Sequence, residues 1–248
     1  MRGTARANDI EPGKEFYNAF RILNPVVIDG VLSEWTGVPV LADPKFAVPK
    51  YSGTNAQPNY VLFEPYQGGT WSGPDDQTSA VQVAYDSDNV YFGFVVTDDY
   101  HENVSGNAWN GDSIQLMIAD AARTNIIALY NYSLGGYEDS QGNLVPDPNL
   151  VNQVIVDHEN LPNGNPSPGG DPACNCPTEA VIKREFLKKK TIYEIKLPAG
   201  SLGLAAPLTD GTRFGLGMAI NDGDGALVDS VQHAQTGQQG QKGWGGLG

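Results

Sequence analysis

Short runs of alternating apolar and polar residues, separated by turn-forming residues, place the strongest limit on how this chain can fold. Residues 79–85 alternate in this way, residues 90–96 are β-branched and aromatic, and residues 86–89 between them supply turn chemistry. Successive side chains of a strand point to opposite faces of a sheet, so the alternation gives one apolar face and one polar face. Residues 79–96 are therefore predicted to form a β-hairpin.

The same signals recur along the chain, and long helices are improbable. Gly (30) and Pro (17) together make up roughly a fifth of the 248 residues, above the ~12% of average usage. We predict an all-β fold, an antiparallel β-sandwich of the jelly-roll or immunoglobulin-like kind with long loops and little helix. The further candidate strands are 25–28, 113–118, 126–132, 151–156, 178–186, 191–197, 214–221 and 226–232.

The chain is expected to form one sandwich domain over residues 25–248, with 1–24 as an N-terminal extension or lead-in strand. No internal repeat or Ser/Gly-rich linker divides it, and single β-sandwiches reach about 200–250 residues. One short helical turn is expected at 198–202, where Pro198 suits the first helical position. Three long loops, 45–78, 100–111 and 158–177, are candidate functional segments.

Charge and motifs exclude several classes of function. Asp and Glu (29) outnumber Lys and Arg (15), and a net charge of −14 argues against nucleic-acid binding. No run approaches the ~18 apolar residues of a membrane helix. No nucleophile elbow, phosphate-binding glycine loop or zinc-protease helix occurs, so we predict a protein that is not an enzyme, although a glycosidase pair among the many carboxylates is not excluded.

The two cysteines and the chain ends add little. Cys174 and Cys176 are separated by one residue, so a disulfide between them would be strained, and further metal ligands are not evident nearby. We expect a loop clip or free thiols. The first residues lack the apolar core of an intact signal peptide, and the glycine-rich last residues indicate a segment of a longer protein.

Two acidic segments are candidates for a structural Ca²⁺ site. Asp98 ends a hydrophobic strand, and Asp222 and Asp224 occupy alternate positions before glycines, as at the start of a calcium loop. The later bidentate Glu of such a loop is missing. A tight Asp-Gly hairpin turn is the alternative for residues 221–225.

Trp109 is a candidate platform for a sugar ring. It lies in a polar, glycine-containing segment just before a predicted strand, whereas a core tryptophan more often lies in an apolar run. A sugar presents an apolar C–H face and a rim of hydroxyls, which pair with a flat aromatic ring and with planar amides or carboxylates. Trp35 is predicted to be core or a plug at the end of the sandwich. For Trp71 and Trp244, local pattern does not decide between a core residue and a ligand platform.

Five segments in order resemble carbohydrate-binding module family 9, within the wider group of DOMON-like β-sandwiches. They are 27–35 (V-I-D-G-x-x-x-E-W), 84–99, 109–116 (W-N-G-D-S-I-Q-L), 193–198 and 214–222. The resemblance runs from about Pro25 to Leu247. It implies a noncatalytic sandwich, usually attached to secreted polysaccharide-degrading enzymes or surface proteins, with structural calcium.

The resemblance also implies residue roles. The family holds a terminal sugar between two tryptophans, with a carboxylate, an arginine and amides bonding the hydroxyls. Trp109 falls on the first tryptophan. Gln115 stands where the glutamate is expected, no arginine matches near 126–132, and 232–241 lacks a second tryptophan, which Trp244, Trp71 or a loop tyrosine would have to replace.

The sequence thus predicts a module that binds a neutral plant-type polysaccharide or oligosaccharide by stacking, within a larger secreted or surface protein that carries an attached catalytic domain. The net charge of −14 disfavours anionic glycans. One alternative is a structural or protein-interaction domain with a degenerate sugar site, and another is haem binding through Met117. The predicted glycan contacts are Trp109, Asn110, Gln115, Asp99, Tyr130, Gln238, Trp71 and Trp244.

Overall fold

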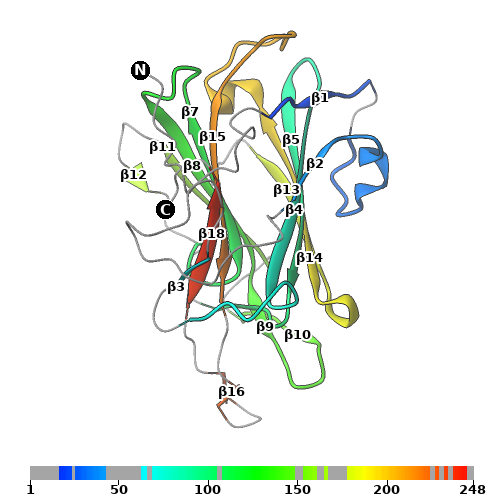
Figure 1. Cartoon of the computed structure of the whole chain (residues 1–248), viewed down its shortest axis with the longest axis vertical. Coiled ribbons are helices and arrows are strands. Elements are labelled where there is room, and N and C mark those ends of the chain that lie inside the picture. Colours follow the sequence, from blue (N-terminus) through cyan, green and yellow to red (C-terminus); the bar gives the residue numbers. More distant parts are fainter. Residues whose placement is uncertain are drawn as a thin grey trace.

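Two β-sheets packed face to face form the body of the protein, as the computed structural model shows (Figure 1). The all-β sandwich predicted from the sequence is confirmed. The structure describes residues 17–23, 26–42, 63–65, 69–104, 108–148, 153–160, 165–166, 178–223, 227–228, 232–233 and 237–244. None of the helical turns among these residues has the length or apolar run of a bilayer-spanning helix.

The first sheet has six strands in the order β1-β4-β5-β14-β13, with β2 also paired to β4. Its centre is the predicted hairpin, and β14 lies antiparallel to β5. Only the short β1 runs parallel to its neighbour β4. The strand bounds are β1 Phe20–Arg21, β2 Val40–Ala42, β4 Gln77–Tyr85, β5 Asn89–Asp98, β13 Glu179–Glu185 and β14 Lys190–Pro198.

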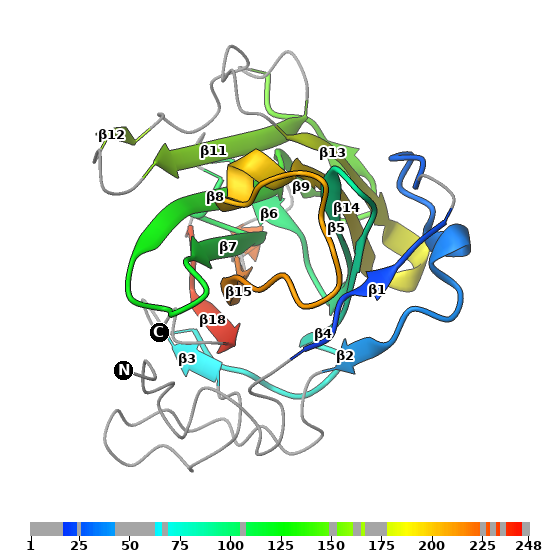
Figure 2. The same cartoon turned by 90° about the horizontal axis from the view of Figure 1, so that it is seen from above.

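The second sheet has seven strands in the order β12-β11-β8-β7-β15-β18-β3, all antiparallel. Seen from above, it faces the first sheet, and β11 and β13 meet along one side (Figure 2). The bounds are β3 Phe63–Pro65, β7 Ser113–Ala119, β8 Ile126–Leu134, β11 Val154–Asn160, β12 Asn165–Pro166, β15 Gly215–Asp222 and β18 Gly240–Trp244.

Smaller elements complete the ends of the sandwich. A three-stranded sheet, β10-β9-β6, closes the lower end in Figure 1. The predicted helical turn is present as a 3-10 turn, η4 (Ala199–Leu202). The remaining bounds are η1 Leu32–Trp35, η3 Phe186–Lys188, β6 Glu102–Asn103, β9 Gly136–Glu138, β10 Leu144–Val145, β16 Leu227–Val228 and β17 Gln232–His233.

Two strand predictions are wrong in detail. Residues 26–28 are irregular rather than a strand, because the backbone that follows them turns to donate hydrogen bonds to a buried side chain. The predicted strand at 226–232 is instead two short antiparallel strands, β16 and β17. The cysteine segment lies outside the described residues.

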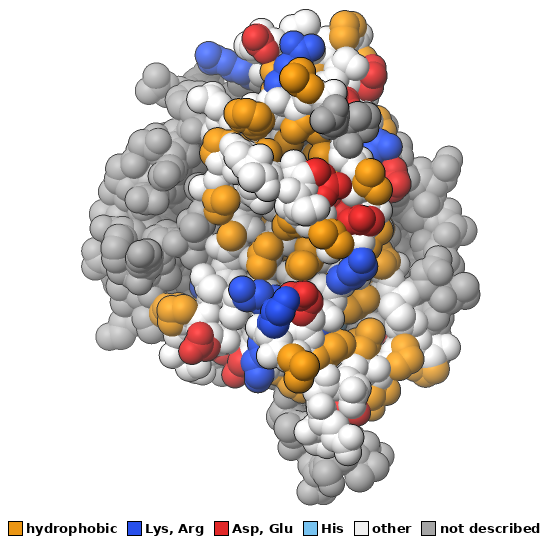
Figure 3. All heavy atoms as spheres, turned by 90° about the vertical axis from the view of Figure 1, so that its right-hand side faces the viewer, with side chains coloured by type: hydrophobic (Ala, Val, Ile, Leu, Met, Phe, Trp, Pro, Cys, Tyr) orange, Lys and Arg blue, Asp and Glu red, His pale blue; other side chains and the backbone are white. Residues whose placement is uncertain are grey.

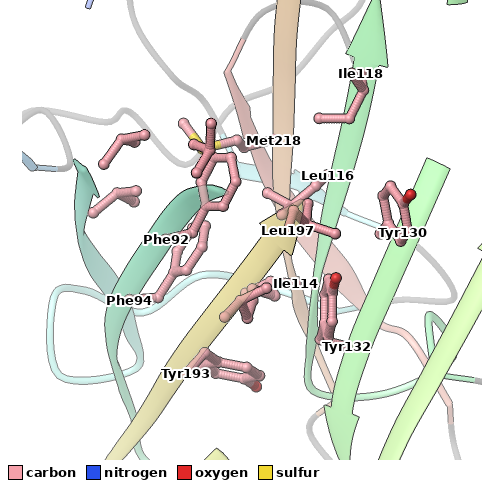
Figure 4. Packing of buried hydrophobic residues seen from close by; sticks show 14 of the residues in the cluster. Phe92, Phe94, Ile114, Leu116, Ile118, Tyr130, Tyr132, Tyr193, Leu197 and Met218 are labelled. Carbon is pink, nitrogen blue, oxygen red and sulfur yellow. The ribbon is translucent and has the colours of Figure 1, made fainter. Parts of the chain in front are cut away.

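The core forms where the inward faces of the two sheets meet. Phe92 and Phe94 of β5 pack against Ile114 and Leu116 of β7, and all four are completely buried (Figure 4). Each is separated from the next inward residue by one residue, as the strand period requires. The apolar alternation read from the sequence therefore describes the interior of this sandwich.

Trp35 forms a second, smaller core on the outer face of the first sheet. Its side chain is 1% exposed and packs with Val26, Val38 and Tyr91. Its indole Nε1 donates a 2.9 Å hydrogen bond to Glu194, a β14 residue that is fully buried although it faces outward. Trp35 is thus core, and it covers a face of the sandwich.

Glu194 explains the D-G-x-x-x-E-W segment. Its carboxylate also accepts hydrogen bonds from the backbone N–H groups of Asp29 (2.8 Å) and Gly30 (2.7 Å). Three donors satisfy a buried charge that would otherwise be costly. Figure 3 shows charged side chains among apolar ones on this side of the molecule. The cross-strand pair Lys196–Glu179 forms an ion pair of 2.9 Å between β14 and β13.

Replacing Glu194 with Gln should lower the free energy of unfolding by about 1–3 kcal/mol. The new amide NH₂ would face a backbone or indole N–H, which leaves buried donors without acceptors. Urea unfolding followed by circular dichroism measures the change. Glu185→Gln, at a side chain that is 40% exposed, is the matched control and should stay within about 0.5 kcal/mol of wild type. Equal stability of the two variants would contradict a stabilising role for the three hydrogen bonds to Glu194.

Candidate functional site

Trp109 lies in a tight turn between β6 and β7, and its side chain is 44% exposed. The neighbouring Ala108 is completely buried, so one side of the turn is anchored in the protein. Gly111 has a φ of +146°, and a Cβ there would lie 2.5 Å from the carbonyl oxygen of Glu102. The turn therefore requires glycine, and it presents a large indole at the surface.

A network of amide side chains holds this turn in place. Asn221 at the end of β15 donates from Nδ2 to the carbonyl oxygen of Trp109 (3.1 Å) and to Ser113 Oγ (2.8 Å). Gln238 Nε2 donates to Asn221 Oδ1 at 2.6 Å, and its backbone N–H donates to Asn110 Oδ1 at 3.0 Å. Three segments far apart in sequence thus converge behind the indole.

The close approach of two of these segments depends on Gly237. Its φ is +65°, and a Cβ would lie 2.3 Å from Asn110 Oδ1. A side chain at this position would displace the Asn110 amide and break its 3.0 Å hydrogen bond with the Gln238 backbone N–H. The glycine-rich, tryptophan-free segment of the sequence therefore has a structural role at this position.

Gln115 and Asn131 lie side by side on the outer face of the second sheet. They are cross-strand partners in β7 and β8, in the row next to the one that contains Ser113, Ser133 and Asn221. Gln115 is partly exposed, whereas Asn131 is 3% exposed and its Oδ1 has no hydrogen-bond partner. Of these groups, Gln115 is the one that reaches the surface, and it offers a neutral amide that donates and accepts hydrogen bonds.

Three buried carboxylates meet on the other side of the same sheet, at the end of the core. Asp98, Asp112 and Asp222 place one oxygen each within 4.8 Å of the others, and each is no more than 3% exposed. Asp112 Oδ1 accepts from the Gly223 backbone N–H (2.7 Å), and its Oδ2 accepts from the Glu102 N–H (2.6 Å). The cluster can hold a metal ion.

The surroundings of the cluster favour a positive charge within it. Burial, followed by repulsion from Asp112, raises the pKa of Asp98 well above its ordinary value, and the Arg184 guanidinium opposes this only in part. Burial and then the Arg184 charge lower the pKa of His101 to about 4, so its imidazole is neutral at pH 7. Full ionisation of Asp98 is therefore unfavourable unless a further positive charge lies beside it.

Two neutral groups beside the carboxylates carry lone pairs. His101 Nε2 donates to the Leu134 carbonyl oxygen (2.9 Å), which leaves Nδ1 as a lone pair 3.3 Å from Asp112 Oδ2. Gln77 is the cross-strand partner of Asp98, is completely buried, and its side-chain oxygen and nitrogen have no hydrogen-bond partner. A donor set made mainly of oxygens fits a hard cation such as Ca²⁺.

The structure brings together only some of the predicted site residues. Trp109, Asn110 and Gln238 belong to one network, and Gln115 lies on the adjoining sheet face. Asp98 and Asp222 belong to the carboxylate cluster. Asp224 lies outside the described residues, and of Trp244 only the backbone, paired with Met218, is described.

Three predicted glycan contacts lie elsewhere. Trp71 is half-buried, donates from Nε1 to the Gln77 carbonyl oxygen and lies under the Lys242 ammonium, 4.7 Å from its ring centre. Asp99 contacts Asp76 and Lys189 through its backbone. Tyr130 is 1% exposed and stacks on Tyr132 inside the core (Figure 4), because even-numbered residues of β8 face inward. Tyr130 therefore belongs to the core rather than to a ligand site.

Asp112, Asn221 and Asn131 are the site residues that sequence reasoning missed. Asp112 and Asn221 stood in the quoted motifs W-N-G-D and I-N-D, so their signal was present. Asn131 could have been found from strand parity, because it is the outward neighbour of two inward tyrosines. The cross-strand register that places it beside Gln115 is a long-range property.

No protein-family model matches the chain, and no curated protein matches it. Among solved structures, the chain is similar to a carbohydrate binding module family 9 from Caldicellulosiruptor kristjanssonii in complex with cellotriose, at 11% identity and a TM-score of 0.47, over 91% of this chain and 83% of that one. It is also similar to such a module from the same organism in complex with glucose, at 13% identity and a TM-score of 0.46, over 90% and 84%.

Without bound cation, Asp98→Asn should match the stability of the wild type near pH 4 and exceed it at pH 7 by about 1 kcal/mol or more. The native wild type holds the Asp98 proton more tightly than the unfolded chain, whose ordinary pKa is 3.8. The wild type therefore loses stability as the pH rises above that value, and Asn cannot ionise.

Urea unfolding in EDTA between pH 4 and pH 7 measures this difference. Asp75→Asn, at an exposed position outside the cluster, is the control and should follow the wild type at every pH. If Asp98→Asn is less stable than the wild type at pH 7, the negative charge of Asp98 does not destabilise the native state, and this prediction is wrong.

Proposed function

We propose that this chain is a noncatalytic carbohydrate-binding module that binds a neutral polysaccharide or oligosaccharide by stacking on Trp109. The observation that carries the proposal is the exposed indole of Trp109, on a turn whose backbone carbonyl accepts from Asn221, which in turn accepts from Gln238. The ordered resemblance of five sequence segments to carbohydrate-binding module family 9 supports the same function.

The turn that carries Trp109 is held in place while its indole stays exposed. Large aromatic side chains are buried on average, and here hydrogen bonds to the Trp109 carbonyl and to Asn110 hold the turn with the indole at the surface. A turn that is already ordered adds little entropy cost when a flat ligand stacks on its indole. The apolar C–H face of a pyranose ring supplies such a surface.

The polar groups beside Trp109 suit a neutral ligand. Asn110 and Gln115 are partly exposed amides, which both donate to and accept from sugar hydroxyls. Asn131, the cross-strand partner of Gln115, is buried and is not part of the surface that a glycan reaches. The net charge of −14 disfavours an anionic glycan.

The carboxylate cluster serves this module as a structural Ca²⁺ site. Asp98, Asp112 and Asp222 would ligate the ion, and the adjacent Gln77 amide adds a further oxygen at the edge of the cluster. The ion supplies the positive charge that the cluster lacks. In this role it joins the end of β5 to the segments that lead into β7 and out of β15.

The setting of the module follows from its function. A small site that stacks one sugar face gives weak binding, which is useful when it holds an attached enzyme near its substrate. We therefore assign the chain to a larger secreted or cell-surface protein that carries a catalytic domain. The catalytic step belongs to that domain.

Trp109→Ala should reduce binding to the preferred glycan at least about tenfold, because stacking provides most of the contact. Affinity electrophoresis and calorimetry against xylan, cellulose, mannan and β-glucan oligosaccharides measure it. Phe20→Ala is the matched control, since Phe20 is an aromatic residue on the other sheet with 48% exposure.

The controls separate the two candidate classes of protein. Phe20→Ala should bind as the wild type does, and circular dichroism should show all three proteins folded. A folded wild type that binds none of these glycans would favour the structural or protein-interaction domain. Binding that survives Trp109→Ala unchanged would place the site elsewhere.

Adding Ca²⁺ to EDTA-treated protein should raise its melting temperature, and Asp222→Asn should abolish the effect. At about one hundred times the dissociation constant, a ligand that binds only the native state stabilises it by ~2.7 kcal/mol. Differential scanning calorimetry measures the shift. The control Asp75→Asn should respond as the wild type does, and an unchanged melting temperature of the wild type would remove calcium from the proposal.

A further inference from the structure

The platform for the glycan and the carboxylate cluster lie on opposite faces of one sheet and are built from adjacent residues. Asn221 faces outward and holds the turn that carries Trp109. The next residue, Asp222, faces inward and belongs to the carboxylate cluster. Because neighbouring residues of a strand point to opposite faces, a shift of one of these side chains moves the backbone of the other.

Asp112 repeats this connection from the other end of the site. It follows Trp109, Asn110 and Gly111 directly and precedes the first residue of β7, so its position fixes the end of the turn. Its two carboxylate oxygens accept from the backbone N–H groups of Gly223 and Glu102, at 2.7 Å and 2.6 Å. The backbone of Asp222 in turn accepts from the Gln239 N–H at 2.7 Å, next to Gln238 of the amide network.

An observation independent of the carboxylates indicates that a cation belongs among them. The His101 side chain is completely buried, and its Nδ1 lies 3.3 Å from Asp112 Oδ2 without a hydrogen bond. Its Nε2 donates to the Leu134 carbonyl oxygen, so Nδ1 presents a lone pair towards a carboxylate oxygen. The buried amide of Gln77, beside Asp98, has no hydrogen-bond partner either. Lone pairs that face one another in a buried space favour a cation between them.

We infer that cation binding and glycan binding are thermodynamically linked in this protein: a divalent cation held by Asp98, Asp112 and Asp222 raises the affinity of the Trp109 platform for its glycan. The inference rests on the proposed function of that platform. Linkage is reciprocal, so the glycan raises the affinity for the cation by the same factor.

The physical cause is preorganisation of the turn. Without the ion, repulsion among the three carboxylates acts on Asp112 and Asp222, and both transmit it to the backbone next to the amide network. With the ion, the two backbones are drawn to fixed positions, and Asn221 then holds the Trp109 turn in the arrangement described here. The cation thus bears part of the ordering cost that the glycan would otherwise bear.

Asp98 provides the cleanest test because it touches only one of the two sites. It lies at the end of β5 in the opposite sheet. Its carboxylate belongs to the cluster and accepts from the Tyr100 backbone N–H, and its backbone pairs with Arg184 and Lys189. Asp98→Asn is therefore expected to remove cation binding while the platform keeps its own residues. Asp75→Asn, exposed and outside the cluster, is the matched control.

The experiment measures glycan and cation affinities by calorimetry, with CaCl₂ as the cation and hexasaccharides of cellulose, xylan, mannan and mixed-linkage β-glucan as glycan probes. In wild type and Asp75→Asn, calcium should raise the glycan affinity by about fivefold or more. In Asp98→Asn, the affinity should equal that of the wild type in EDTA, with or without calcium. Titrating CaCl₂ into the wild type with saturating glycan should show the same factor.

Each outcome bears on a different part of the inference. A wild type that binds calcium and binds glycan equally well in calcium and in EDTA would overturn the linkage and leave the proposed function intact. A wild type that binds no glycan in either condition would overturn both. Trp109→Ala should lose the glycan and keep calcium binding, and loss of calcium binding in this variant would show a general disruption of the fold instead of linkage.

Discussion

The carboxylate of Asp112 holds together the three segments that form the candidate site. One oxygen accepts from the Glu102 backbone and the other from the Gly223 backbone, while its own backbone continues into β7. A side chain with two acceptor oxygens is needed for this, and a buried, charge-assisted contact of this kind is stronger than one between neutral groups. It acts together with buried Ala108 and with Asn221, which holds the Trp109 carbonyl, to fix the turn that carries Trp109.

The same residue creates the electrostatic problem at this end of the sandwich. Asp112 is within reach of Asp98 and Asp222, and burial keeps water from screening the three charges. Glu194 on the other sheet is also a buried carboxylate, yet three N–H donors satisfy it locally. The contrast shows that burial alone does not make a cation site. Repulsion between several carboxylates at one place does.

The alternation of inward and outward residues along a strand could be predicted from the sequence, whereas the pairing of distant segments could not. The alternation at 79–96 gave the central hairpin, and the I-x-L-x-I pattern of β7 gave its inward face, because both depend on local spacing. Parity also explains why Tyr130 belongs to the core and Asn131 to the outer face, a step the sequence permits. The contact between Asp112 and Gly223 joins residues 111 positions apart, and no local pattern reports such a pairing. The Asp residues could be singled out from their turns, but their convergence required the register of β5, β7 and β15.

Among the described residues, the proposed sugar site has one aromatic wall, Trp109, and this affects how such a module would be used. Trp71, the other tryptophan indole that the structure describes near this edge of the sheet, donates to a backbone carbonyl and lies under Lys242, so it supports β18 instead of enclosing a ligand. A slot between two facing aromatic rings suits the terminal sugar of a chain. A single ring also leaves space for a sugar in the interior of a chain. Modest affinity at one site still localises a protein when a second domain of the same chain engages the same polymer, because the local concentration is set by the connection between the domains. In the proposed function, one aromatic wall among the described residues therefore suits attachment along a polysaccharide better than tight capture of a small sugar.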